Sequence, residues 1–387
     1  MQKVFFTGTH RVRVPEETEA ALLPLLGEYG ITRLADVTGL DTLGIPVVMS
    51  VRPLATTLSV SQGKGASKLL ARLSAAMEAI ELWHAENAVP PPTLSGVAAS
   101  GLRLPYDVTE LRWPAGSLIC EHTRLDWIDA QLLPSGQTVP VPRGAVVLGE
   151  MPDSWQVPGL TNTSNGLASG NTLAEATVHA LYEVIERDSV TVEAEMPVQE
   201  RRCIDPASVD DEHCADLISR ISSAGGFLEL EDIPGRTHVP CMSARLWHED
   251  LASSVMHGTG AHGDPAVALS RAITEAAQSR LTQISGARDD IASARYRPGH
   301  FSRPELPDRA VAWADVLSGY PDRPFETDVA EADWLAGRVH EVTGSAPMRV
   351  VLAEREEFAV VRVVCPGMLH EEHHHESRQL TKEGGVR

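Results

Sequence analysis

The sequence contains no long apolar run, and this absence excludes a helix that spans a membrane. No segment of the 387 residues approaches the roughly 20 apolar residues that such a helix needs. Residues 1–20 also lack the apolar region and the cleavage site of a secretory signal peptide. We therefore expect a cytoplasmic protein without a membrane partner.

Cysteines and positive charges are also scarce. The five cysteines are dispersed and form no C-x-x-C pair, so we expect neither a disulfide framework nor a zinc site. Only 33 lysines and arginines face 53 aspartates and glutamates, which gives a formal net charge of -20. Because binding to nucleic-acid phosphates requires clustered basic residues, this charge argues against a nucleic-acid partner. A local pocket can still bind an anion, directly or through metal ions.

The chain does contain a unit of strands, a glycine-rich loop and a helix, and this unit occurs three times. Apolar and β-branched residues predict the strands, and residues with helical periodicity follow each loop. The three copies comprise residues 45–86, 125–190 and 239–283. No change of composition divides the chain, so we expect one domain over residues 1–387.

The remaining segments are arranged around this repeat. We expect an N-terminal segment at 1–60, the repeated core at 61–285, an irregular segment at 286–326, and a helix, two strands and a tail at 327–387. Two interpretations of the arginines in the irregular segment remain open, namely recognition of a peptide and a solvated basic patch. These arginines are Arg288, Arg295, Arg297, Arg303, Arg309 and Arg323.

The three helices share polar residues at positions i, i+4 and i+7, which lie on one helix face. One interpretation is an ordinary solvated face. Acidic residues three apart without a basic partner repel each other, however, and the glycine-rich loops before the first two helices allow a backbone to approach a phosphate. The triplets are Ser74, Glu78 and Glu81; His179, Glu183 and Glu186; and Arg271, Glu275 and Gln278.

Carboxylates that converge from separate helices suit Mg²⁺, which prefers oxygen ligands and is usually shared with substrate phosphates. Arg187, Asn171 and Ser74 would then contact phosphate or sugar oxygens. The stretch around "GKG" lacks the first glycine of a P-loop and the Ser or Thr after its lysine, so the pattern predicts an ATP site of another kind. A glycosidase needs only two acids, and no G-x-S-x-G motif supports a serine hydrolase.

Together these motifs resemble those of the YcaO family. That family builds its ATP site from S-x-x-x-E-x-x-E-R, from N-x-x-x-E followed by E-x-x-E-R, and from R-A-x-T-E-x-x-Q-x-R. The corresponding stretches here are "SAAMEAIEL" at 74–82, "NTLAEATVHALYEVIER" at 171–187 and "RAITEAAQSR" at 271–280. Similarity extends from "THR" at 9–11 to "PG" at 366–367. The resemblance implies an α+β YcaO fold, with mixed sheets flanked by helices around a central ATP site.

The resemblance also assigns roles to individual positions. Arg11 and Thr18 correspond to a basic and a hydroxyl residue near the start of the family's domain, and the family arginine after the first carboxylate pair is Leu82 here. The implied Mg²⁺ ligands are Glu78, Glu81, Glu175, Glu183 and Glu186. The implied ATP contacts are Arg11, Lys64, Ser74, Asn171, Arg187, Glu275, Gln278 and Arg280.

The activity that this resemblance implies is ATP-dependent activation of a peptide backbone amide. A nucleophile adds to the amide carbon, the resulting oxyanion takes the γ-phosphoryl group of ATP, and phosphate then departs. Glutamate-bound Mg²⁺ neutralises the charge that develops during transfer. The nucleophile does not come from the enzyme in this scheme, so we expect no catalytic nucleophile in this chain.

The chain also resembles one subgroup of the family, which works with a TfuA protein. The resemblance lies in "HRVRVPEET" and "GITRLADVTGLDTLGIPVVMSVRP" near the start and in "ISGARDD" after the third helix. Azoline-forming members often end in a P-x-P-x-P tail, which this chain lacks. The resemblance therefore favours thioamide formation in a ribosomally made precursor peptide or a protein, with a TfuA-like partner that supplies sulfur.

Two alternatives stay open. One is an enzyme that forms azolines or amidines, and the other is a catalytically silent subunit that only binds a peptide or a partner. Because residues 1–60 already match the family, we expect no separate leader-binding domain before the first motif. We also expect a homodimer.

Overall fold

The computed structural model describes residues 2–111, 113, 118–149, 163–233, 235–249, 255–288, 310–321 and 324–370. The helices are α1 (Pro15–Leu22), α2 (Lys68–Asn87), α3 (Leu173–Glu195), α4 (Glu212–Ser223), α5 (Pro265–Ser285), α6 (Trp313–Leu317) and α7 (Asp328–Thr343). The strands are β1 (Val4–Phe6), β2 (Thr9–Arg11), β3 (Arg33–Asp36), β4 (Val47–Val51), β5 (Val60–Lys64), β6 (Leu94–Ala98), β7 (Arg124–Leu132), β8 (Thr138–Pro142), β9 (Leu167–Gly170), β10 (Arg202–Ile204), β11 (Phe227–Asp232), β12 (Cys241–Trp247), β13 (Met256–Ala261), β14 (Met348–Glu354) and β15 (Ala359–Val364). In these ranges no helix combines the length and the apolar character needed to cross a bilayer.

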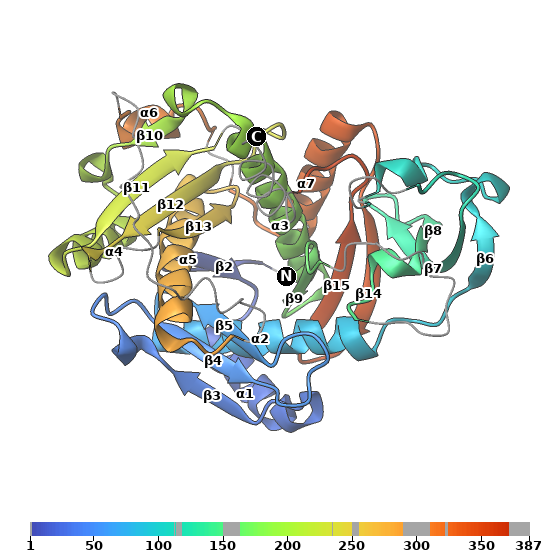
Figure 1. Ribbon diagram of the computed structural model, residues 1–387, viewed down its shortest axis with the longest axis horizontal. Helices are drawn as coiled ribbons and strands as arrows, with labels where there is room; N and C mark the ends of the chain where they lie inside the picture. Colours follow the sequence, from blue (N-terminus) through green and yellow to red (C-terminus); the bar gives the residue numbers. More distant parts are fainter. Residues whose placement is uncertain are drawn as a thin grey trace, which may run out of the picture.

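Three sheets surround a centre where α2, α3 and α5 meet (Figure 1). The sheet β3-β4-β5 packs on α2, and α5 packs on the sheet β10-β11-β12-β13. The third sheet has the order β6-β7-β14-β15-β9, with β8 paired to β7, and α3 lies against its β9 and β15. Each central helix is therefore supported by a different sheet.

The predicted α+β class is confirmed. The sheets, however, are antiparallel and not mixed as expected. Within the described ranges, the pairings between the named strands are all antiparallel. Among the described residues, the expected mixed character is limited to an isolated parallel bridge between Ile204 and Val311. Adjacent strands linked by short turns pair in this way because a hairpin needs only a few residues.

The three central helices follow the glycine-rich loops, as the sequence predicts, and each begins at a capping residue. Ser67, Thr172 and Asp264 precede α2, α3 and α5, and the side-chain oxygen of each accepts a hydrogen bond from a backbone N–H of the first turn. Such a cap satisfies one of the N–H groups that a helix start leaves without a partner. The end of each glycine-rich loop is therefore also the start of a helix.

The second repeat differs from the prediction. The hairpin β7–β8 forms as expected, but β7 pairs with β6 and β14 and lies away from α3. The strand that precedes α3 is β9, and its partner is β15, near the end of the described chain. Periodicity reports local structure only, so this distant pairing could not be read from the sequence.

The apolar faces of the central helices point away from one another. Buried residues of α2, such as Ile80, belong to an apolar cluster with β7 and β14. Ile273 of α5 belongs to a second cluster with α4, β11 and β12, and Ile185 of α3 belongs to a third with α7 and β15. Because each apolar stripe faces its own core, the polar faces of the three helices are left toward a shared centre.

Candidate nucleotide and metal site

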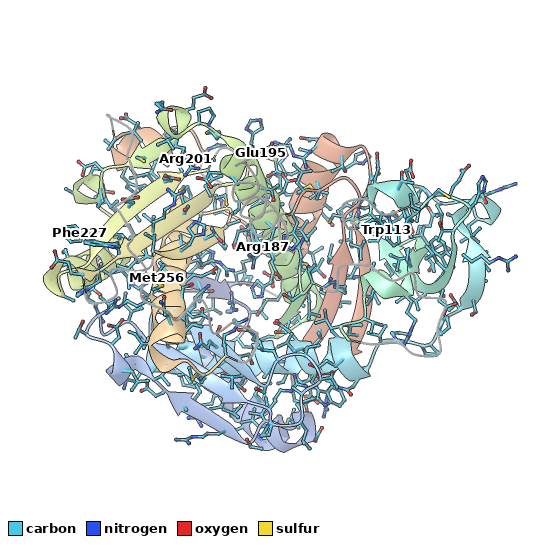
Figure 2. The ribbon with its side chains drawn as sticks, in the orientation of Figure 1. Trp113, Arg187, Glu195, Arg201, Phe227 and Met256 are labelled. Atoms are coloured by element: carbon cyan, nitrogen blue, oxygen red, sulfur yellow. The ribbon has the colours of Figure 1, made fainter. Side chains whose placement is uncertain are left out.

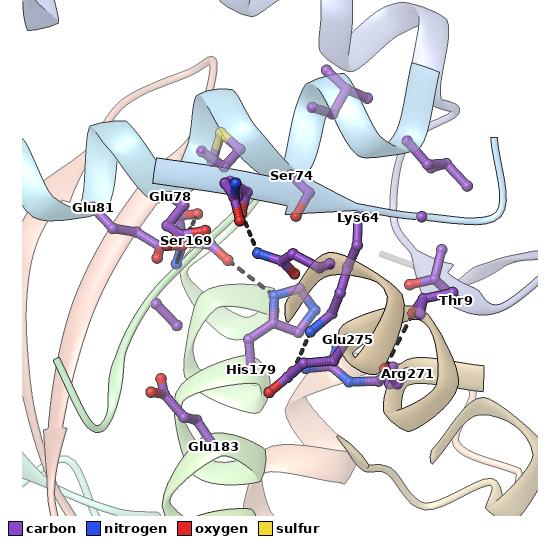
Figure 3. A pocket seen from close by; sticks show the side chains of 18 of the residues that line it. Thr9, Lys64, Ser74, Glu78, Glu81, Ser169, His179, Glu183, Arg271 and Glu275 are labelled. Atoms are coloured by element: carbon purple, nitrogen blue, oxygen red, sulfur yellow. Dashed lines mark hydrogen bonds and ion pairs between the residues drawn. The ribbon is translucent and has the colours of Figure 1, made fainter. Parts of the chain in front are cut away.

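A cavity of about 620 Å³ lies where α2, α3 and α5 meet, and residues of β2, β5 and β9 also line it. Figure 3 shows polar side chains from the three helices turned toward this space. Every residue that was expected to hold ATP or Mg²⁺ lines the cavity, with the exception of Arg280. The i, i+4, i+7 pattern therefore identifies three helix faces that enclose one site.

The first two carboxylates come from α2. The Glu81 Oε1 atom accepts hydrogen bonds from the backbone N–H of Ser169 on β9 (2.8 Å) and from the hydroxyl of that serine (2.5 Å). Burial raises the pKa of Glu81 to about 8 and the pKa of Glu78 to about 7. A bound cation would favour the ionised form of both groups, because it offsets the cost of burying their charge.

The next two carboxylates come from α3. Glu186 is 5% exposed, and it accepts hydrogen bonds from the Thr259 hydroxyl (2.6 Å) and from the Ala261 N–H (3.1 Å) on β13. Burial raises the pKa of Glu183 to about 7, although the positive charge of Arg187 opposes this shift. Figure 2 shows Arg187 near the centre of the molecule. These four carboxylates and Arg187 thus line one cavity, which Glu175 of α3 also lines.

Glu175 differs from these four because donors of the protein surround it. One carboxylate oxygen accepts from the Val12 N–H (3.0 Å), and the other accepts from the Asn171 N–H (3.2 Å) and side-chain amide (3.1 Å). The Arg11 Nε atom lies 3.6 Å away, and the Thr18 hydroxyl holds the Asn171 oxygen at 2.8 Å. This geometry positions Arg11 and Asn171 at the edge of the cavity. Binding of Mg²⁺ by Glu175 stays a prediction.

The third helix, α5, contributes less negative charge. Glu275 forms an ion pair with Lys64 of β5. Burial favours a higher pKa for Glu275, but Lys64 and Arg187 lower its pKa overall, so the carboxylate is ionised. The Gln278 Nε2 atom donates a hydrogen bond to the Gln62 carbonyl oxygen (2.9 Å). The three carboxylates whose pKa values are raised by burial therefore lie on α2 and α3, which favours these helices as the metal-binding side.

The i+7 residues connect the three repeats in a ring. Glu81 of α2 binds the backbone of β9, Glu186 of α3 binds the backbone of β13, and Gln278 of α5 binds the backbone of β5. Each helix is thus joined to the last strand of the following repeat, and α5 closes the circle. At position i+7, a glutamate accepts a hydrogen bond from a backbone N–H, and a glutamine donates one to a backbone carbonyl oxygen. Either residue can therefore join its helix to the neighbouring strand.

The hairpin β1–β2 closes one side of the cavity. Thr9 and Arg11 of β2 line it, and Lys3 fixes the hairpin by ion pairs with Asp328 (3.1 Å) and Glu331 on α7. The Lys3 side chain is 3% exposed, so these pairs are shielded from water. The start of the described chain is therefore part of the wall of the site.

Arg280 lies outside the cavity. Its Nε and Nη2 atoms bind the two carboxylate oxygens of Asp41 at 2.9 and 3.0 Å, and both side chains are 2% exposed. At 100° per residue, Arg280 is rotated by about 140° from Glu275 around α5, so it faces another side of the helix. The structure thus does not place Arg280 with the other expected ATP contacts, and instead it ties α5 to the loop after β3.

Three cations of the cavity, Arg13, Arg271 and Arg288, were not expected from the sequence to contact ATP. Leu82, which replaces the family arginine, also lines the cavity, is 8% exposed and packs in the apolar cluster of α2. Arg271 is position i of the α5 triplet, so the i, i+4, i+7 pattern already placed it on the same helix face as Glu275 and Gln278. Arg288 follows α5 and is one of the arginines that were considered for recognition of a peptide, but its spacing did not predict a place in this cavity. The other arginines of the irregular segment, and the tail at 371–387, lie outside the described residues.

The donor set fits Mg²⁺ that is shared with phosphates. In the described part of the chain, no three acidic, histidine or cysteine side chains are already arranged to hold a metal ion. Mg²⁺ usually takes one or two carboxylates and completes its shell with water and substrate phosphates. Six carboxylates line the cavity, and burial raises the pKa values of three of them, Glu78, Glu81 and Glu183, which matches this requirement.

We expect the affinity for Mg²⁺ in the presence of ATP to increase as the pH rises from about 6 to about 8. Glu78, Glu81 and Glu183 have pKa values of about 7, 8 and 7 because they are buried. The cation binds the ionised carboxylates, so binding releases protons below these values. Calorimetric titration in buffers with different heats of ionisation counts the protons. The Glu183→Gln variant should release fewer, and an affinity that is independent of pH would contradict this account.

The comparison with known families identifies the chain's relatives. The family described as YcaO cyclodehydratase, ATP- and Mg²⁺-binding, matches residues 62–369. An uncharacterized protein of Mycobacterium tuberculosis is 42% identical over 377 residues, which cover 94% of this chain and 83% of the relative. A Rhizobium leguminosarum bv. trifolii protein, named only for its place in the tfuA 3′ region, is 38% identical over 391 residues, covering 92% of this chain and 88% of the relative.

Solved structures share the fold. A YcaO from Methanopyrus kandleri, bound with AMPPCP and Mg²⁺, superposes with a TM-score of 0.71 at 24% identity, and 95% of each chain is covered. A heterocyclase in complex with substrate and cofactor superposes with a TM-score of 0.73 at 20% identity, covering 93% of this chain and 53% of that one. At these identities the likeness establishes the architecture around the cavity.

Proposed function

Because the chain belongs to the YcaO family, an ATP-dependent group of peptide-modifying enzymes, we propose that it activates a peptide backbone amide by O-phosphorylation and installs a thioamide. The observation that carries this proposal is the convergence of Glu78, Glu81, Glu183 and Glu186 on one cavity that also contains cations. Phosphoryl transfer needs positioning and neutralisation of negative charge, and this arrangement supplies both.

In this proposal, the residues of the cavity divide into two groups. The carboxylates of α2 and α3 would hold Mg²⁺, which when bound neutralises the charge that develops on the transferred phosphoryl group. Arg11, Arg187 and Arg271 line the same cavity and would bind the phosphate oxygens directly. Lys64 is held by Glu275, so its ammonium group is fixed at the cavity wall.

The support for a thioamide product comes from the genomic position of a relative. The Rhizobium leguminosarum protein in the tfuA 3′ region is similar over 92% of this chain. The place of that relative beside tfuA supports a TfuA-like partner for this chain, which would supply sulfur as the nucleophile. The substrate would be a precursor peptide or a protein, since activation of a backbone amide requires a polypeptide.

The test compares peptides from the source organism with peptides from a strain that lacks this gene, complemented with the wild type or with Glu186→Gln. We expect at least one peptide with the mass shift of oxygen exchanged for sulfur in the wild-type strains only. Loss of water at Cys, Ser or Thr would indicate azoline formation instead. If no peptide differs between the strains, the proposed activity is wrong.

A further inference from the structure

The sheet β10-β11-β12-β13 has a second face that the proposed function does not yet use. Alternate residues of a strand point to opposite faces, and Leu230, Met242 and Ala244 belong to the apolar cluster of α5. On the opposite face, Cys241 and Ala261 pack in the cluster of α3. We call the remainder of that opposite face the outer face, and it includes Phe227, Glu231, Arg245, Trp247, His257 and Thr259.

The outer face adjoins the central cavity along β13. The Thr259 hydroxyl donates a hydrogen bond to Glu186 (2.6 Å), and the Ser279 hydroxyl donates one to the His257 carbonyl oxygen (2.8 Å). Glu186 and Ser279 both line the cavity. His257 is exposed, and its Nε2 atom lies 2.9 Å from the Ser243 hydroxyl, which orients the ring. A polypeptide that leaves the cavity on the side of Glu186 therefore meets the outer face.

The middle of the outer face is polar, and its charges are balanced. Arg245 forms ion pairs with Glu231 and with Glu193 of α3 (2.7 Å), and Glu193 also pairs with Arg201 (2.6 Å). Two arginines thus face two glutamates, and these contacts fix the Arg245 side chain, which is 17% exposed. A polyanion would require an excess of positive charge. Fixed polar groups without that excess fit a polypeptide.

The outer face ends at an aromatic pair. Phe227 and Trp247 lie opposite each other on β11 and β12, with ring centroids 5.1 Å apart and an angle of 44° between the planes. Phe227 is 42% exposed. Figure 2 shows Phe227 at the edge of the molecule and Arg187 near its centre. Exposed aromatic rings offer apolar surface that a side chain of a ligand can cover.

The register of the strands gives the length of this path. Trp247 lies one residue beyond the level of Met256, and Met256 is three residues from Thr259. At about 3.3 Å per residue, the aromatic pair is about 13 Å along the strands from the point where Thr259 contacts Glu186. An extended polypeptide covers this distance with about four residues.

We propose that the outer face binds the substrate polypeptide in an extended conformation, with an apolar side chain against Phe227 and Trp247. That side chain belongs to a residue at least four positions from the activated amide. The inference rests on the proposed function, because only a polypeptide whose amide reaches the cavity continues onto this face. Selection of the substrate would then depend on a residue that is not itself modified.

The test measures KM and kcat with a synthetic, unmodified copy of the peptide that the strain comparison identifies as modified. Phe227→Ala and Trp247→Ala should raise the KM for this peptide about tenfold, as expected for the loss of one apolar contact. The kcat and the dissociation constant of ATP should not change, because the aromatic pair lies away from the cavity. Trp247→Phe, which retains a ring, should restore most of the affinity.

Replacement of single peptide residues by aspartate tests the same contact from the substrate side. With the wild type, aspartate at one apolar position at least four residues from the modified amide should raise KM about tenfold. With Phe227→Ala the same peptide should show little further loss, because two changes that remove one contact are not additive.

Leu94→Ala is the matched control. Leu94 of β6 is 38% exposed, close to the value for Phe227, and β6 lies on the other side of the molecule in Figure 1. The control should leave KM and kcat unchanged.

Every other outcome decides against the inference. An unchanged KM in both alanine variants would overturn it and leave the proposed function intact. Weaker binding of ATP in both variants would show that these residues act through the cavity. Loss of a complex with the TfuA-like protein at an unchanged KM would assign the outer face to that partner. A strain comparison without any modified peptide would overturn the inference and the proposed function together.

Discussion

Replacement of Glu186 by glutamine is expected to lower ATP-dependent turnover by about a thousandfold and to leave the fold intact. A bound metal ion stabilises the charge of the transition state by several kcal/mol, and we expect most of this to be lost with one of its carboxylate ligands. A loss of about 4 kcal/mol corresponds to a thousandfold change in rate. Glutamine retains the size of the side chain. Its Oε1 atom can still accept from the Ala261 N–H, and its amide can donate to the Thr259 hydroxyl, which now donates to Glu186.

The measurement is the rate of ADP release. The substrate is a synthetic, unmodified copy of the peptide that the strain comparison identifies as modified. Glu195→Gln is the matched control, because Glu195 is an exposed residue at the end of the same helix and lies away from Arg187 in Figure 2. The control should retain full activity. If Glu186→Gln is as active as the wild type, Glu186 is not part of the metal site.

Replacement of Gly63 by alanine is expected to destabilise the protein by about 3 kcal/mol or more. A methyl group at Gly63 would lie 2.0 Å from the backbone nitrogen of Ala75 and 2.3 Å from the carbonyl oxygen of Ala71 on α2. Backbone atoms of a helix cannot move independently, so β5 would have to separate from α2. Because β5 also carries Lys64 and Gln62, the affinity for ATP should fall as well.

Urea unfolding measures this change, since a shift of the midpoint at a constant slope reports a difference in stability. Gly337→Ala on α7 is the control. A methyl group there has no neighbouring atom within 4 Å, so alanine should stabilise the helix by roughly 0.5–1 kcal/mol. A Gly63→Ala protein as stable as the wild type would show that β5 and α2 are not packed as described.

The same close contact occurs in the other two repeats. A methyl group at Gly170 on β9 would lie 2.5 Å from the backbone nitrogen of Ala176, and one at Gly258 on β13 would lie 2.2 Å from that of Ala276. A glycine in the strand and an alanine in the helix let the two backbones approach in each case. The glycines near the loops therefore have a packing role as well as a possible role beside phosphate.

The helix faces of the site could be predicted from the sequence because residues i, i+4 and i+7 must share a face. This rule placed Glu78, Glu81, Glu183, Glu186 and Glu275 correctly around one cavity. The order of loop and helix was also predicted, since helical periodicity follows each glycine-rich loop, and the structure adds a capping residue at each helix start. Both features depend on neighbours in the sequence.

Other features depend on distant contacts and were not predictable. The pairing of β9 with β15, and the backbone donors on β9 and β13 that hold Glu81 and Glu186, bring together segments far apart in the chain. Arg280 shows the opposite error, because its motif position suggested a nucleotide contact while its direction around α5 leads it to Asp41. A motif gives the residue type at a position, and only the packed helix gives its direction.

The most direct test of the account is a crystal structure of the protein with AMPPCP and Mn²⁺ in place of Mg²⁺, in which anomalous scattering locates the metal. We expect the metal between α2 and α3, within ligand distance of carboxylate oxygens from both the Glu78–Glu81 pair and the Glu183–Glu186 pair, with the phosphates toward Arg187. A nucleotide bound outside the cavity, or a metal that no carboxylate of these helices contacts, would contradict the central claim.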